Sequence, residues 1–165
     1  MLIKYKRGRC ISFTFSVGSY SHLSSNAKVI YFENYTMKKA KIHLREYDWT
    51  VYLFFNSRPS DSDEILAYLR RIGCKGYNLS RAIKSLENGR KNEGLTYSNY
   101  SRRESVIVIG DASSLDELMN SSAHEIDHLA KHIVEANGVD VFSEQASYLV
   151  GDLTQKIYKV IENEY

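Results

Sequence analysis

A change of hydrophobic period between residues 105 and 138 is the feature that most constrains the fold of this chain. Ser105–Ile109 is rich in β-branched residues and is closed by Gly110-Asp111, which is typical of a buried strand. Ser114–Glu117 then has the form of a capping box, and it opens a helical pattern that Asn137-Gly138 ends. The apolar stripe of that helix is Met119, Ala123, Ile126, Ala130 and Ile133. The sequence therefore predicts a strand followed directly by one long helix.

The rest of the chain predicts a β-rich first part and three further helices. Strands are expected at Ile11–Val17, Lys28–Phe32, Lys41–Arg45 and Thr50–Phe55. Helices are expected at Ser62–Ile72 with Gly73 as the left-handed cap, at Leu79–Asn88 between Asn78 and Gly89, and from between Asp140 and Ser143 to about Glu162. This pattern indicates an α+β fold with a small mixed sheet in one domain of 165 residues, β-rich at 1–56 and strand-helix-helix at 105–162.

The segment Gly89–Glu104 is polar and shows no hydrophobic period. Loops of this length are uncommon in compact domains and often border functional sites. We therefore expect Gly89–Glu104 to be a mobile loop at the edge of such a site.

Composition and charge favour a soluble, cytoplasmic protein. Cys10 and Cys74 are the only cysteines and lack metal-ligand spacing, which is typical of a reducing compartment. No apolar run reaches the length of a membrane span, so no membrane partner is expected. Residues 1–103 carry 19 Lys or Arg against 8 Asp or Glu, while residues 104–165 carry 3 against 12. Because the basic residues are scattered, this asymmetry argues against nucleic acid as the partner.

The long helix carries His124-Glu125-Ile126-Asp127-His128, an H-E-x-x-H motif. Histidines four residues apart lie on one helical face and can share a tetrahedral zinc ion. Both histidines fall outside the apolar stripe, so the expected ligand pair lies away from that stripe. Glu125 would then lie beside the open position of the metal. Asp127 cannot face the metal, and it is expected to make a hydrogen bond either at the surface or to a group that supports the metal ligands.

A catalytic zinc ion needs a third protein ligand. His132 and Glu135 lie too far along the helix from His124 to share one ion with it. Asp140 would have to fold back from the turn. Glu144 opens the next helix after a short turn and is the third ligand that we predict.

The motif followed after fifteen residues by Glu144 resembles the gluzincin branch of the zincin metallopeptidases. The string Glu144–Leu149 is similar to the glutamate helix of compact bacterial and phage-associated metallopeptidases, including those that cleave immunity repressors. The resemblance covers residues 105–160 and implies a zincin-like fold, in which Ser105–Ile109 is an edge strand packed on the active-site helix. At the place where thermolysin-like members have an aspartate, this chain has Tyr148.

The resemblance implies hydrolysis of peptide bonds in a peptide or protein substrate by a Zn²⁺-activated water, with Glu125 as the general base. Tyr97, Tyr100 and Tyr148 are the candidates for stabilising an oxyanion. Two alternatives stay open at this point: a non-catalytic zincin-fold module of a phage or mobile element that binds zinc or a partner, and a nucleic-acid-binding domain that uses the basic half. The oligomeric state does not follow from the sequence.

Overall fold

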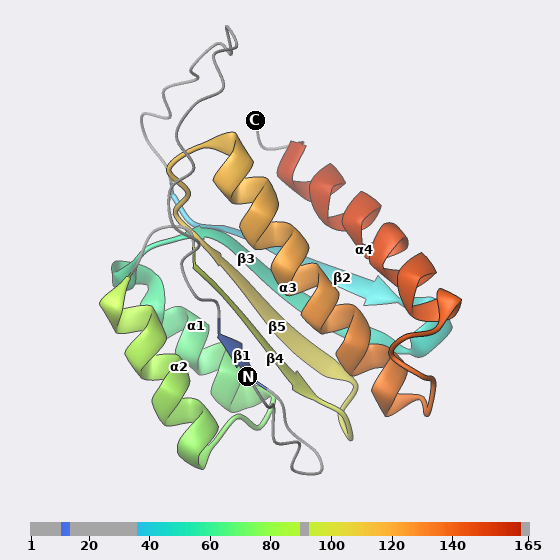
Figure 1. The fold of residues 1–165 in the computed structure, drawn as a ribbon. Helices are drawn as coiled ribbons and strands as arrows, with labels where there is room; N and C mark the ends of the chain where they lie inside the picture. Colours follow the sequence, from blue (N-terminus) through green and yellow to red (C-terminus); the bar gives the residue numbers. More distant parts are fainter. Residues whose placement is uncertain (1–10, 14–35, 90–92, 163–165) are drawn as a thin grey trace, which may run out of the picture.

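The computed structural model describes residues 11–13, 36–89 and 93–162, and these form a mixed sheet between two pairs of helices (Figure 1). In chain order the elements are β1 (Ile11–Phe13), β2 (Lys38–Leu44), β3 (Trp49–Ser57), α1 (Ser62–Arg71), α2 (Gly76–Asn88), β4 (Gly94–Asn99), β5 (Glu104–Gly110), α3 (Leu115–Ala136) and α4 (Glu144–Glu162). Short 3₁₀ turns occupy Arg45–Tyr47 and Pro59–Asp61. The predicted α+β class with a small mixed sheet is confirmed.

The sheet has the strand order β1-β4-β5-β3-β2. β3 and β5 are parallel, with Tyr52 opposite Val106, and every other described pairing is antiparallel. The prediction that Ser105–Ile109 is an edge strand is therefore wrong, because β4 and β3 flank β5 on both sides. The strand that the sequence did not predict, β4, takes the place beside β5 and separates it from the short β1.

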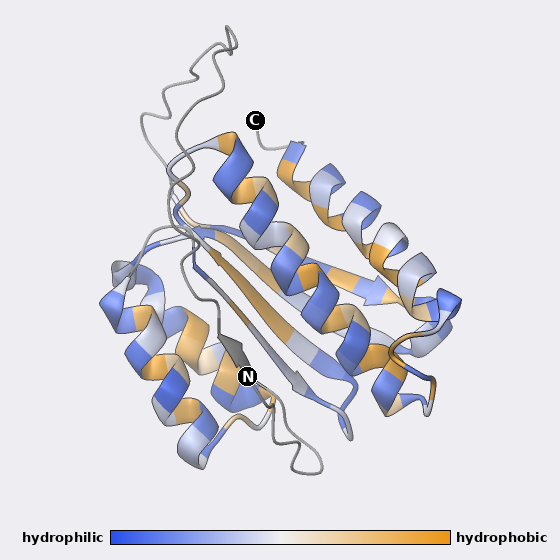
Figure 2. Cartoon of the chain, viewed as in Figure 1, coloured by the Kyte–Doolittle hydropathy of each residue, from blue (hydrophilic) through white to orange (hydrophobic). Residues whose placement is uncertain are grey.

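Each face of the sheet has its own hydrophobic core, because the side chains of a strand alternate between its faces. On β3, Trp49, Val51, Leu53 and Phe55 pack with α3 and α4. Phe54 points the other way and packs with α1 and α2. Figure 2 shows apolar residues along β3 and β5 and polar residues on the outward side of α3.

The helix predictions are largely confirmed. α1 buries Ile65, Leu66 and Leu69, and Gly73 follows it at φ +90° in the left-handed region that glycine tolerates. α2 begins at Gly76, three residues before the predicted start, and α4 begins at Glu144. At the start of α3 the Ser114 hydroxyl accepts a hydrogen bond from the Glu117 amide at 3.2 Å, as the capping box predicts.

The buried face of α3 differs from the predicted stripe at its start. Met119 is 48% exposed, and Ala123 is exposed as well, whereas Leu118 and Leu129 are buried. The difference arises because α3 contacts both the sheet and α4, so its buried face is broader than a single stripe and turns toward β4 and β5.

The predicted loop Gly89–Glu104 contains a buried strand instead, so the prediction of a loop is wrong, whereas the prediction that this segment borders the site is confirmed by the contacts of Thr96 and Ser98 with α3. β4 pairs with β5 along its length, and its residues from Gly94 to Ser98 are buried. A tight turn stabilised by Asn99, whose side-chain oxygen accepts from the Arg102 amide at 3.2 Å, then leads into β5. β4 and β5 thus form a β-hairpin, and β4 lies between β1 and β5 in the sheet.

Some predictions lie outside the described residues, namely the strand at Lys28–Phe32, the end of the strand after Phe13, and the environment of Cys10. Cys74 is a buried thiol, 2% exposed. None of the helices in residues 36–89 and 93–162 is long and apolar enough to cross a membrane.

Candidate metal centre

His124 and His128 converge in the middle of α3. Their Nε2 atoms are 2.9 Å apart, and their ring planes meet at 79° with centroids 4.5 Å apart. Two nitrogens that share one tetrahedral zinc ion, each at 2.0–2.1 Å, would be separated by about 3.3 Å. The two imidazoles are thus arranged as a bidentate pair, as the four-residue spacing predicts.

Burial keeps both imidazoles neutral at neutral pH. It lowers the pKa of His124, against a smaller opposing effect of the Asp127 carboxylate. Burial and the neighbouring His124 lower the pKa of His128 to about 4. A neutral imidazole is the form that binds a metal ion, so the pair does not have to lose protons before it can act as a ligand.

Asp127 lies beside the pair and pairs with Lys131 one turn later. The Lys131 Nζ donates to the Asp127 carboxylate at 2.6 Å, and both side chains are more than two-fifths exposed. Asp127 therefore makes a surface contact, which is one of the two kinds of contact predicted for it.

Glu125 points from α3 toward the sheet and is completely buried. The Thr96 hydroxyl of β4 lies 2.7 Å from the Glu125 Oε2 and 3.2 Å from the Glu125 backbone carbonyl oxygen, and it can donate to either. Gly94, two residues earlier on β4, lies directly against the Glu125 side chain. β4 thus contacts the Glu125 carboxylate in two ways: Thr96 donates a hydrogen bond to it, and Gly94 leaves room for it.

His132 extends the row of histidines by one more turn, and it is buried. Its Nδ1 lies 2.9 Å from the Ser98 hydroxyl of β4, which lies 2.7 Å from the Ser105 hydroxyl of β5. The Trp49 indole N–H donates to Ser105 at 2.8 Å. This chain of four groups, here called the Trp49–His132 network, crosses three strands to reach α3.

One direction of hydrogen bonding gives every contact of the network both a donor and an acceptor. The Trp49 N–H can only donate, so Ser105 accepts from it, donates to Ser98, and Ser98 donates to the His132 Nδ1. This direction places the proton of neutral His132 on Nε2. Burial, with a smaller effect of His128, lowers the pKa of His132 to about 3, in accord with a neutral ring.

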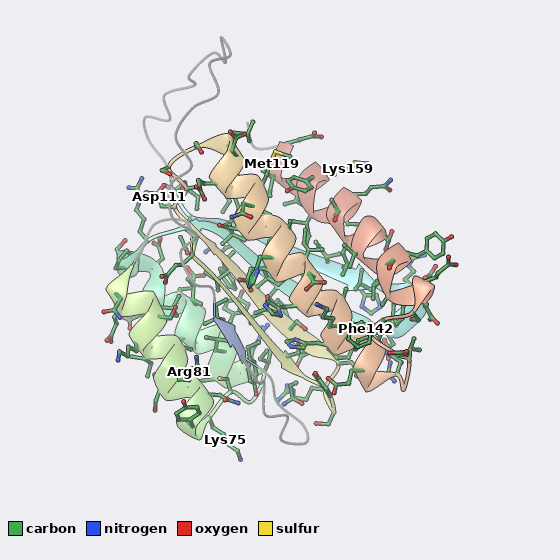
Figure 3. The ribbon with its side chains drawn as sticks, viewed as in Figure 1. Lys75, Arg81, Asp111, Met119, Phe142 and Lys159 are labelled. Atoms are coloured by element: carbon green, nitrogen blue, oxygen red, sulfur yellow. The ribbon has the colours of Figure 1, made fainter. Side chains whose placement is uncertain are left out.

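Glu144, the predicted third ligand, does not join the histidine pair in this structure. α4 runs antiparallel to α3, and the Tyr158 hydroxyl near its end donates to the Met119 carbonyl at 3.1 Å. Figure 3 shows Met119 and Phe142 at opposite ends of the two helices, so Glu144 lies at the far end of α3. Among the described residues, no group of three His, Cys, Asp or Glu side chains is placed to hold a metal ion.

The three tyrosines considered for an oxyanion lie in different places. Tyr97 is buried on the opposite face of β4, in the core with α1 and α2. Tyr100 donates to Glu135 at 2.8 Å and faces the His132 ring, with centroids 5.9 Å apart. Tyr148 is 75% exposed on α4. Tyr100 alone contacts the histidine row.

A cavity of about 210 Å³ opens on the other side of β4. Leu86, Leu95 and Val108 line it together with Arg58 and Asp111, whose charged groups are 3.9 Å apart. None of the histidines lines it, so this cavity is separate from the candidate metal centre.

Sequence reasoning missed the β4 side of the site, formed by Gly94, Thr96 and Ser98. The available signal was the alternation of small polar residues with Leu95 and Tyr97 between two turns. This alternation is too short to predict a buried strand by itself, because burial of the Thr96 and Ser98 hydroxyls requires hydrogen-bond partners. Those partners, Glu125 and His132, lie about thirty residues further along the chain.

No protein-family model, no curated protein and no solved structure matches this chain.

Proposed function

We propose that this protein is a zinc-dependent metallopeptidase in which His124 and His128 bind the metal ion and Glu125 is the general base. The observation that carries the proposal is the convergence of the two Nε2 atoms at 2.9 Å on one helix. The depressed pKa values of both histidines support it, because they make both nitrogens available as ligands at neutral pH.

The residues present fit a zinc ion in part. Two neutral imidazoles are nitrogen donors of the kind that zinc binds in proteins, and both are partly buried. Glu144 can reach them only if the start of α4 moves, so the proposal does not include Glu144 among the ligands. When bound, zinc would polarise a substrate carbonyl and lower the pKa of a coordinated water.

The chain itself contributes the base and its environment. Glu125 adjoins His124 in sequence and shares its helix, and its carboxylate is shielded from bulk water. In the proposed role this carboxylate accepts a proton from the attacking water and passes it to the leaving amine. Thr96 determines where one of its oxygens lies.

A second candidate is a non-catalytic zinc-binding module, and the burial of Glu125 favours it. A general base must reach the water that it activates, and Glu125 is 0% exposed with Thr96 and Gly94 against it. In this alternative Glu125 stabilises the contact between α3 and β4, while the histidine pair holds a structural ion.

Metal analysis and a matched set of variants test the proposal. Purified wild-type protein is expected to hold one zinc ion per chain, and His128→Ala to hold none, while His43→Ala, which removes an exposed histidine of β2, keeps the metal. Full zinc content in His128→Ala would overturn the ligand assignment.

Hydrolysis of a diverse peptide library separates the two candidates. Glu125→Gln is expected to keep zinc and lose roughly 10²–10⁴-fold in activity, the usual contribution of a general base. An inactive, fully zinc-loaded wild type would favour the non-catalytic module. Equal activity in wild type and Glu125→Gln would remove Glu125 from the mechanism.

A further inference from the structure

We propose that Thr96 of β4 is the positioning residue for Glu125, and that the hydroxyls of β4 hold the motif-bearing segment of α3 in its working orientation. This inference rests on the proposed function, because it assigns Thr96 a role through the proposed base. Thr96 is not one of the proposed metal ligands.

The Thr96 hydroxyl contacts Glu125 at two atoms. One hydroxyl group lies within hydrogen-bonding distance of both the carboxylate and the backbone carbonyl of the same residue, at 2.7 and 3.2 Å. It therefore constrains the side-chain torsions of Glu125 relative to the helix axis. Since Thr96 is completely buried, no water competes for this hydroxyl from bulk solvent.

A second contact between β4 and α3 joins Ser98 to His132. Ser98 faces the same side of β4 as Thr96 and holds His132, seven residues after Glu125 on α3. The two contacts lie before and after His128 on the helix. Their polar groups need specific partners, so they fix both the rotation and the register of α3 on the sheet more sharply than apolar packing would.

The hydrogen bond from Thr96 also bears on the free energy of burying the Glu125 carboxylate. A buried carboxylate without a directed donor would lose the hydrogen bond that offsets its removal from water. With Thr96 in place, Oε2 is oriented toward β4. The carboxylate is thereby held against β4, between Thr96 and Gly94.

Replacement of Thr96 by valine and by serine forms the test. Valine keeps the shape and removes the hydroxyl, whereas serine keeps the hydroxyl and removes a methyl group. We expect Thr96→Val to lower kcat roughly 10- to 100-fold, because a small displacement of a catalytic group costs up to about 100-fold in rate. KM and zinc affinity should stay within about threefold of wild type, and Thr96→Ser should recover most of kcat.

Ser122→Ala is the matched control, since it removes a buried α3 hydroxyl that donates to the Leu118 carbonyl and not to Glu125. It should leave kcat unchanged. If Thr96→Val does not fold, Thr96→Cys, which keeps a weak donor of similar size, should give a kcat between those of wild type and Glu125→Gln. Unchanged kcat in a folded Thr96→Val, or an equal loss of zinc affinity and activity, would overturn the proposal.

The carboxyl ¹³C resonance of Glu125, assigned by its loss in Glu125→Gln, provides a readout that does not depend on activity. It should shift in Thr96→Val and return toward the wild-type position in Thr96→Ser. An inactive wild type overturns the proposed function, and the resonance then decides alone whether Thr96 orients Glu125. No shift in Thr96→Val would show that it does not.

Discussion

A Cβ atom on Gly94 would lie 2.5 Å from the Cγ of Glu125 and 2.6 Å from its Oε1. No real Cβ atom tolerates such contacts, so the absence of a side chain at residue 94 is what lets α3 lie on β4 with Glu125 between them. Gly94 and Glu125 therefore depend on each other, although 30 residues separate them in sequence.

Gly94→Ala is expected to destabilise the protein by about 2–3 kcal/mol, because the methyl group overpacks a buried site. The cost should fall in a Glu125→Ala background, where the space is free, and a double-mutant cycle measures this coupling. Gly151→Ala on α4, where nothing lies within 4 Å of the added Cβ, should instead stabilise the protein by about 0.5–1 kcal/mol. Purely additive costs for Gly94→Ala and Glu125→Ala would contradict the contact.

Local sequence signals predicted the parts of the fold that depend on neighbours in the chain. The capping serine Ser114, the β-branched residues of β5 and the left-handed Gly73 each act within a few residues. The convergence of His124 and His128 follows from helix geometry alone, and it was predicted correctly for that reason.

The features that were missed depend on contacts between distant segments. β4 has a polar inner face, which is buried only because Glu125 and His132 satisfy its hydroxyls. The position of Glu144 depends on the length of α3, which continues eight residues past His128 to Ala136 before the chain turns into α4. The sequence of β4 alone, or of α4 alone, does not predict which residues of α3 it contacts.

Ser98→Ala is expected to destabilise the protein by about 2–3 kcal/mol, because it interrupts the Trp49–His132 network. The change leaves the Ser105 hydroxyl and the His132 Nδ1 buried without their partner, and an unsatisfied buried group costs about 1–3 kcal/mol. Trp49 is the only tryptophan of the chain, so its fluorescence follows urea unfolding directly at this network. A cost no larger than that of Ser122→Ala would show that the network contributes little.

His132 should make the metal-free protein sensitive to acid. Its pKa is lowered to about 3 in the folded state, against 6.5 for an unperturbed histidine, so the unfolded state binds more protons between these values. Stability therefore falls as the pH drops below 6.5, by about 2 kcal/mol from this residue at pH 5. His132→Asn keeps an acceptor for Ser98 but cannot titrate in this range.

The comparison of wild type with His132→Asn isolates this effect from that of His128, whose pKa is also lowered. Urea unfolding in the presence of a chelator at pH 7.5 and pH 5 gives the free energy of unfolding for both proteins. The wild type should lose about 2 kcal/mol more than His132→Asn over this interval. Identical losses would mean that His132 is not held neutral by burial.

Zinc should stabilise the folded protein through the histidine pair and independently of Glu144. A ligand that binds only the folded state adds about 2.7 kcal/mol at a free concentration 100 times its Kd. We expect this gain in wild type and in Glu144→Ala, because Glu144 lies at the far end of α3, and no gain in His128→Ala. Urea midpoints measured with and without zinc provide the comparison, with Gln145→Ala as the control for a change at the start of α4. If Glu144→Ala loses the gain while Gln145→Ala keeps it, the start of α4 must move to the histidine pair when zinc binds, and the three-ligand site predicted from the sequence would be correct.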